Sequence, residues 1–108
     1  MIKLKDLIIE ASNTKKGFEV IRTLTHGHPL KFGRMTKANW VQHHATGIIF
    51  GGGKYKGGNT GAQIFTQGDD KYRVEILKAI SPKPRISKKI KNVEGDMLYS
   101  TLKKYLGI

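Results

Sequence analysis

The sequence predicts a small α+β domain, in which short N- and C-terminal helices pack on an antiparallel sheet of three to five strands. Three observations support this prediction. The chain has 108 residues, enough for a single domain over residues 1–108 with one modest core. Apolar residues recur at helical spacing near both ends of the chain. Between them, runs rich in β-branched and aromatic residues are separated by glycine-containing turns, which is typical of antiparallel strands.

The first predicted helix covers residues 2–11. Its apolar positions follow the i, i+3, i+4, i+7 spacing of one helix face and are Leu4, Leu7, Ile8 and Ala11. A helix this short is marginal alone, so we expect it to dock on the rest of the chain or on a partner. The polar residues 12–14 are expected to end it. Residues 18–25 alternate and are rich in β-branched side chains, which predicts the first strand.

The segment after this strand is predicted as a turn at residues 26–29, because a proline disfavours the helical conformation of the residue before it. Residues 31–35 are expected to form a second, short strand. For residues 37–44 the sequence supports both a helix capped by Thr36 and an alternating strand, and the period does not separate them. Residues 48–50 are predicted as an apolar strand.

Residues 51–61 form a glycine-rich segment, in which six of the eleven residues are glycine and Lys54, Tyr55 and Lys56 lie at the centre. We expect a long loop between two strands, with two ammonium groups and the tyrosine ring exposed at its tip. The segment lacks the G-x-x-x-x-G-K-[ST] spacing of nucleotide-hydrolysing loops. Its backbone amides could still bind one phosphate, and the alternative is a disordered hairpin tip.

The clearest predicted hairpin joins residues 62–67 and 71–77 through a glycine-containing turn at residues 68–70. Its second strand is expected to have one wet face and one buried face, which carries Tyr72, Val74 and Ile76. The last predicted helix opens at Glu94 and Asp96. Its apolar face is expected to comprise Leu98, Leu102, Tyr105 and Leu106, with Gly107 as the stop.

Residues 81–91 are predicted to form a basic arm rather than a regular element. Pro82 and Pro84 prevent a regular helix at its start. Ile86 and Ile90 stand four residues apart, which is compatible with one anchoring turn of helix. The arm has no acidic residue and carries Lys83, Arg85, Lys88, Lys89 and Lys91. We expect it to become ordered when it binds a partner.

The composition indicates a polyanionic partner. The formal net charge is +12, with 20 Lys and Arg against 8 Asp and Glu, and self-repulsion at this density destabilises a compact chain. The absence of cysteine excludes disulfides, thiolate metal sites and cysteine nucleophiles. No apolar run approaches the ~20 residues of a membrane helix, so no membrane partner is expected. The expected location is intracellular.

Nucleic acid, either DNA or RNA, is the expected partner. The candidate binding residues are Arg34, Lys37, Lys54, Tyr55, Lys56, Lys83, Arg85, Lys88, Lys89 and Lys91. Aromatic rings among these cations could stack on unpaired bases. Phe32 and Trp40 are further aromatic candidates, although the core is the favoured place for Trp40. Tyr55 has only lysine and glycine around it and is therefore expected at the surface.

The four histidines are weaker candidates for a metal or a general base, namely His26, His28, His43 and His44. No carboxylate lies near them in sequence to orient a ligating imidazole. Adjacent residues of a strand also point to opposite faces. No cofactor and no catalytic residue are therefore predicted, and phosphate contacts or turn hydrogen bonds are the favoured roles.

The opening sequence Met-Ile-Lys-Leu-Lys-Asp-Leu-Ile-Ile-Glu resembles the leader of many small proteins of large contractile-tailed bacteriophages, marine ones especially. Residues 8–10 are similar to the hydrophobic-x-Glu sites that prohead proteases of such phages cut. The resemblance covers about ten of the 108 residues. The resemblance implies a viral origin, a location in the host cytoplasm or the virion, and a place in or near the capsid. It leaves open whether Glu10 is a processing site.

The sequence therefore favours a non-enzymatic nucleic-acid-binding accessory protein with little sequence preference. One alternative is a phage structural or decoration protein whose basic arm and N-terminal helix contact other virion subunits or copies of itself. A second alternative is a histidine metal-dependent hydrolase or nuclease. The three hypotheses make different demands on the folded protein. The first requires a cluster of cations, the second a self-complementary surface, and the third a cluster of imidazoles.

Overall fold

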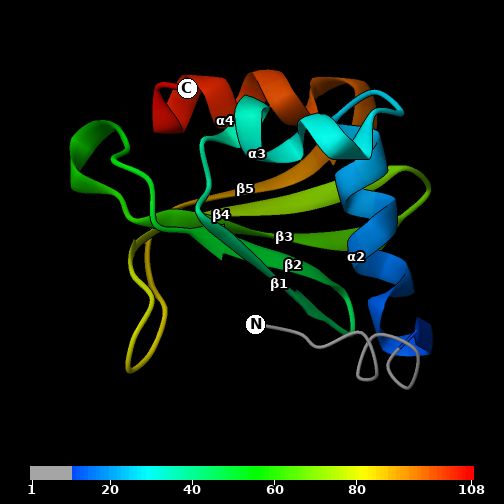
Figure 1. The fold of residues 1–108 in the computed structure, drawn as a ribbon, viewed down its shortest axis with the longest axis horizontal. Helices are drawn as coiled ribbons and strands as arrows, with labels where there is room; N and C mark the ends of the chain where they lie inside the picture. The colour runs from blue at the N-terminus through cyan, green and yellow to red at the C-terminus, as the bar shows by residue number, and fades with distance from the viewer. Residues whose placement is uncertain (1–10) are drawn as a thin grey trace.

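A computed structural model describes residues 11–108, which form one antiparallel sheet with helices on one face (Figure 1). The elements in chain order are α2 (Ala11–Leu24), η1 (Pro29–Lys31), α3 (Phe32–Thr36), β1 (Trp40–His44), β2 (Gly47–Gly51), η2 (Lys56–Gly58), β3 (Gly61–Gly68), β4 (Lys71–Ala79), β5 (Arg85–Glu94), η3 (Gly95–Met97) and α4 (Leu98–Leu106). The predicted α+β class is confirmed. Within residues 11–108, no helix has the length and apolar character needed to cross a membrane.

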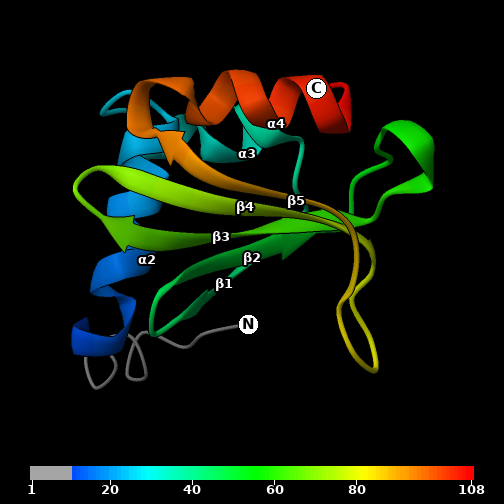
Figure 2. The same ribbon diagram turned by 180° about the vertical axis from the view of Figure 1, so that it is seen from behind.

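The five strands pair consecutively in the order β1-β2-β3-β4-β5, so every connection within the sheet is local. Ile48, Ile64 and Val74 lie side by side across β2, β3 and β4 and are fully buried. Because side chains alternate along a strand, their sequence neighbours face the other side of the sheet. The helices cover the first face, and we call the second the open face (Figure 2).

The first described helix corrects two predictions. Residues 12–14 belong to α2 and do not end a helix, and residues 18–24 are helical rather than a strand. Val20, Ile21 and Leu24 are buried at helical spacing against the sheet. Gly17 lies where α2 crosses β1, since a Cβ there would be 2.1 Å from His43 Nδ1. Tertiary packing of this stripe overrides the strand preference of the β-branched residues. The helix predicted over residues 2–11 lies outside the described residues except for Ala11.

The segment between α2 and β2 confirms one prediction and corrects another. Residues 25–28 form the expected turn, with positive φ at His26 and Gly27. Residues 31–35 are not a strand, because Phe32–Thr36 is helical and buries Phe32 in the core. Thr36 ends this helix and bonds back to the carbonyl of Phe32 (2.7 Å) instead of capping a following one. Of the two alternatives for residues 37–44, the strand is correct.

The predicted hairpin of β3 and β4 is confirmed. Gly68 pairs with Lys71, and Asp69 and Asp70 between them both have positive φ, as a two-residue type I′ turn requires. Tyr72, Val74 and Ile76 are buried on the helix side as expected. The expected wet face is corrected, because Glu75 is 4% exposed and Leu77 is fully buried on that side. The final helix is also confirmed, but its start is corrected: Glu94 is the last residue of β5, Asp96 lies in η3, and α4 begins at Leu98. Its last turn ends at Gly107, which has a φ of 72° and donates to the carbonyl of Lys103 over 2.9 Å.

The prediction that residues 81–91 form an irregular or partly helical basic arm is wrong. Residues 85–94 form the edge strand β5, paired with β4 along its length. The prolines lie in the β4–β5 turn, where no ladder hydrogen bond is needed. The apolar signal is faint because only Val93 of β5 is buried. Ile86 and Ile90 are strand residues opposite Leu77 and Val74.

Candidate nucleic-acid interface

The carboxylates of the described residues are concentrated at one end of the sheet. Five of the six lie there, namely Glu19, Asp69, Asp70, Glu94 and Asp96. Glu19, Asp69 and Asp70 line one small pocket beside the β3–β4 turn. Glu94 ends β5 opposite Lys71, and the amide of the next residue, Gly95, donates to the carbonyl of Asp70 over 3.1 Å. This end of the molecule therefore holds most of the negative charge.

The opposite end brings together the glycine loop, the end of β4, the start of β5 and the last turn of α4 (Figures 1 and 2). Lys78 Nζ donates to the carbonyl of Gly57 over 2.5 Å, and Ser87 Oγ donates to Asn59 Oδ1 over 2.8 Å. Lys56 packs against Gly107, where a Cβ would lie 3.1 Å from Lys56 Cβ. These contacts tie the loop between β2 and β3 to β4, to β5 and to the end of α4.

Two lysines from different elements share one aromatic ring at this end. Lys88 Nζ of β5 lies 5.9 Å from the ring centroid of Tyr105 in α4, and Lys104 Nζ lies 5.4 Å from the same centroid. The negative face of an aromatic ring attracts an ammonium group within about 6 Å of its centroid. The ring therefore offsets part of the repulsion between the two cations.

We call this surface the basic end. It comprises Lys54, Lys56, Lys78, Lys83, Arg85, Lys88 and Lys104, all exposed. Among the described residues, its three chain segments, 52–60, 78–88 and 103–108, contain no Asp or Glu side chain. The charge of the described chain is thus polarised along the sheet.

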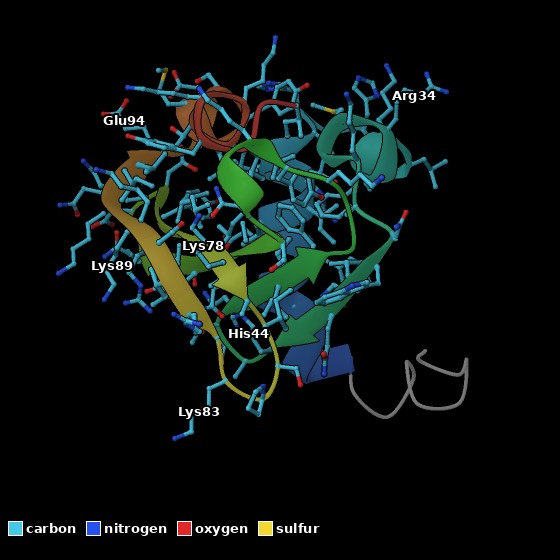
Figure 3. All side chains as sticks on the ribbon, turned by 90° about the vertical axis from the view of Figure 1, so that its left-hand side faces the viewer. Arg34, His44, Lys78, Lys83, Lys89 and Glu94 are labelled. Carbon is cyan, nitrogen blue, oxygen red and sulfur yellow. The ribbon has the colours of Figure 1, made fainter. Side chains whose placement is uncertain are left out.

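The structure brings only part of the predicted binding set together. Lys54, Lys56, Lys83, Arg85 and Lys88 belong to the basic end, and the carbonyl of Lys37 lies against Gly53 at the base of the glycine loop. Arg34 lies on α3, away from Lys83 and Lys89 (Figure 3). Lys89 points to the open face, where it lies 3.8 Å from Glu75. Lys91 lies toward the acidic end of β5.

The prediction that the Tyr55 ring is exposed at the loop tip is wrong. Tyr55 is 6% exposed and belongs to the core, with its ring edge-on to Phe50 at 6.5 Å. Its hydroxyl donates to the carbonyl of Thr36 over 2.9 Å. Burial raises the pKa of the phenol above its usual range. The loop folds back on the core, so this ring cannot stack on a base. Phe32 is likewise buried, whereas Trp40 is partly exposed.

The sequence analysis did not identify Lys78 and Lys104 as members of the basic end, nor Tyr105 as the ring that Lys88 and Lys104 share. Lys78 gives no signal of its own in the sequence, because it lies near the end of a strand that is otherwise nearly balanced in charge. Lys104 and Tyr105 are typical of an ordinary helix C-terminus in the sequence. A lysine is favoured there by the negative end of the helix dipole. The adjacency of a lysine and a tyrosine is the only local signal of their shared role.

The histidines do not converge. His26 and His28 lie in the exposed α2–η1 turn, while His43 and His44 point to opposite faces of β1. Burial lowers the pKa of both strand imidazoles, and for His43 the neighbouring His44 lowers it further. In residues 11–108, no three histidine or carboxylate side chains approach closely enough to hold a metal ion. This geometry does not assemble the metal site of the hydrolase alternative.

Comparisons of the chain with protein-family models, curated proteins and solved structures found no match. Function is therefore inferred from the charge distribution and contacts of the described residues.

Proposed function

We propose that this protein is a non-enzymatic nucleic-acid-binding accessory protein with little sequence preference, and that its basic end contacts the phosphates. The observation that supports this proposal is the polarised charge. Seven cations from three segments share a surface without an acidic side chain, while five carboxylates lie at the other end. A protein with this charge distribution attracts a polyanion to its positively charged end.

The chemistry of the basic end fits phosphate contact more closely than base reading. Lysines predominate on it, and an ammonium group acts as a point charge rather than a bidentate fork. Phosphate contacts position a protein on nucleic acid and carry no direct sequence information. Little sequence preference and a strong salt dependence are the expected properties.

The test compares two variants that lose the same charge. The first replaces Lys56, Lys83, Lys88 and Lys104 with glutamine, and the second replaces Lys15, Lys31, Arg34 and Lys71, which are exposed elsewhere. Affinity for a mixed-sequence oligonucleotide is measured by fluorescence anisotropy at several salt concentrations. Each phosphate contact contributes about −0.9 to the log–log slope on duplex and about −0.7 on a single strand.

We expect the slope of the first variant to become shallower by about 3 units, and the second to stay near the wild type. A wild-type affinity that does not change with salt would rule out the proposal. Equal effects of the two variants would rule out the basic end as the site. A stable homo-oligomer free of nucleic acid after nuclease treatment would support the virion structural alternative instead.

A further inference from the structure

The open face of the sheet carries a row of stacked side chains from three strands. His44, Phe65 and Arg73 occupy one register row across β1, β3 and β4, with Gly47 of β2 between the first two. The ring centroids of His44 and Phe65 are 4.9 Å apart at an interplanar angle of 33°. Arg73 Cζ lies 4.2 Å from the Phe65 centroid. Because Gly47 has no side chain, the imidazole reaches across β2 to the phenyl ring.

The chain's single tryptophan lies at the other end of the same face. Trp40 pairs with Gly51 of β2, and a Cβ on Gly51 would lie 3.0 Å from Trp40 Cζ2 and 2.9 Å from Ile80 Cδ1. The indole thus lies across a glycine, supported by Ile80 from the β4–β5 turn. Trp40 is nevertheless 38% exposed. An indole that spans a glycine and keeps an open side is a stacking surface.

The charges between these two aromatic positions suit an anionic chain. Glu75, at the centre of the open face, is 4% exposed. Its carboxylate accepts a hydrogen bond from Gln63 Nε2 (2.6 Å) and lies 3.1 Å from Arg73 Nε and 3.8 Å from Lys89 Nζ. Two cations therefore outweigh the one carboxylate there. The β4–β5 turn, which carries Lys83, projects on the side of the sheet away from α4 (Figures 1 and 3).

We infer that the open face binds single-stranded nucleic acid, with unpaired bases stacking on Trp40 and on the His44–Phe65–Arg73 row. This inference rests on the proposed function and specifies its substrate as single-stranded. Unpaired bases stack on aromatic and guanidinium planes irrespective of sequence, whereas the bases of a duplex already stack on one another. Phosphates of the same strand meet Lys89 at the β5 edge and continue toward the basic end. Loss of one stacking position is expected to weaken single-strand binding roughly tenfold to a hundredfold.

The single tryptophan makes the test direct, because selectively excited tryptophan emission reports on Trp40 alone. The full chain is titrated with oligo(dT) and with a duplex of equal length. Binding is followed by anisotropy of the labelled nucleic acid and stacking by tryptophan emission. We expect oligo(dT) to quench the emission and the duplex to leave it nearly unchanged. Trp40→Leu and Phe65→Leu are expected to lower single-strand affinity at least tenfold and duplex affinity less than twofold.

Leu30→Ala provides the matched control, since Leu30 is fully exposed on η1 and its substitution should alter neither readout. Circular dichroism checks that each variant is folded. If Phe65→Leu unfolds, Trp40→Leu carries the test, because Trp40 is partly exposed on an edge strand.

The outcomes separate this inference from the proposed function. Salt-dependent binding without quenching, and with equal loss for single strand and duplex, would overturn the stacking face and leave the basic end supported. Quenching by oligo(dT) that is unaffected by the four glutamine substitutions at the basic end would support the stacking face and overturn that end as the phosphate site. Quenching that grows with protein concentration alone would identify the face as a contact between copies and overturn the inference.

Discussion

Tyr55 Oη donates a hydrogen bond of 2.9 Å to the backbone carbonyl of Thr36, 19 residues earlier in the chain. This bond joins the glycine loop to the end of α3. Because Tyr55 is buried between them, Lys54 and Lys56 on either side are held at the surface by an anchored residue. The glycine loop is therefore a positioned element of the basic end.

Replacing Tyr55 with phenylalanine tests this anchor. The ring stays in the core, but the buried carbonyl of Thr36 loses its partner from the loop, which we expect to cost about 1–2 kcal/mol of unfolding free energy. The midpoint of urea denaturation measures the change. Tyr99→Phe on α4, where the ring is only half-buried, serves as the control and should change stability by less than about 0.5 kcal/mol. Equal effects of the two substitutions would contradict an anchoring role.

Gly47→Ala is expected to destabilise the sheet strongly. A Cβ at this position would lie 1.8 Å from the carbonyl oxygen of Ile64, so the β2 and β3 backbones would have to separate. We expect a loss of about 3 kcal/mol, at the upper end of the range for overpacking. Gly33→Ala in α3 is the control, because no atom lies within 4 Å of its Cβ position, and it should be neutral or slightly stabilising. Thermal denaturation of both variants decides the point, and similar melting temperatures would refute it.

Glu75→Gln is expected to lower stability and to raise affinity for nucleic acid. The substitution removes the charge that holds Arg73 and Lys89, at a cost of about 1–2 kcal/mol. The same two cations become free to meet phosphates, so the salt slope on a single strand should steepen by up to about 1.4 units. Glu19→Gln makes the same charge change on the exposed surface of α2 and should leave stability nearly unchanged. Weaker binding by Glu75→Gln would count against the open face as a phosphate-facing surface.

Stability is expected to fall as the pH drops from about 7.5 to 5.5. Burial lowers the folded-state pKa of His43 and His44 below the ordinary value of 6.5, so the unfolded chain binds more protons in this range. The stabilisation is complete above pH 6.5 and is lost as the pH falls through the lower folded pKa values. Urea midpoints measured across this range should decline for the wild type. A His43→Gln, His44→Gln double variant should show a flatter profile, and an unchanged slope would exclude these imidazoles as the cause.

The central sheet could be predicted from the sequence because its information is local. The β3–β4 hairpin has Tyr72, Val74 and Ile76 at alternate positions after a turn at Asp69 and Asp70. Likewise, α4 has an apolar stripe ended by Gly107. The sequence also contains the helical spacing of the buried face of α2, at Gly17, Val20, Ile21 and Leu24. Its β-branched residues favoured a strand, and only the long-range contact with β1 decides for the helix.

The strand β5 could not be predicted from its own residues. Only Val93 is buried and only Ile90 is half-buried, while the other positions of β5 are exposed, so no apolar period marks a strand. Its conformation comes from pairing with β4.

The candidate site was predicted in composition but not in arrangement. Lys88 and Lys104 are far apart in sequence and meet only because α4 packs beside β5 around Tyr105. The exposed rings were assigned to the wrong residues for the same reason. The neighbours of Tyr55 in sequence are glycine and lysine, while its neighbours in space are Phe50 and Thr36.

The lysines of β5 also disfavour aggregation between copies of the protein. In the described sheet β5 is the last strand, so one side of its backbone has no strand beside it. An uncovered edge of this kind is a template for aggregation, and like charges along it repel a second copy. Acetylation of these lysines would remove the repulsion, and the modified protein is expected to aggregate through this edge while the native one stays monodisperse.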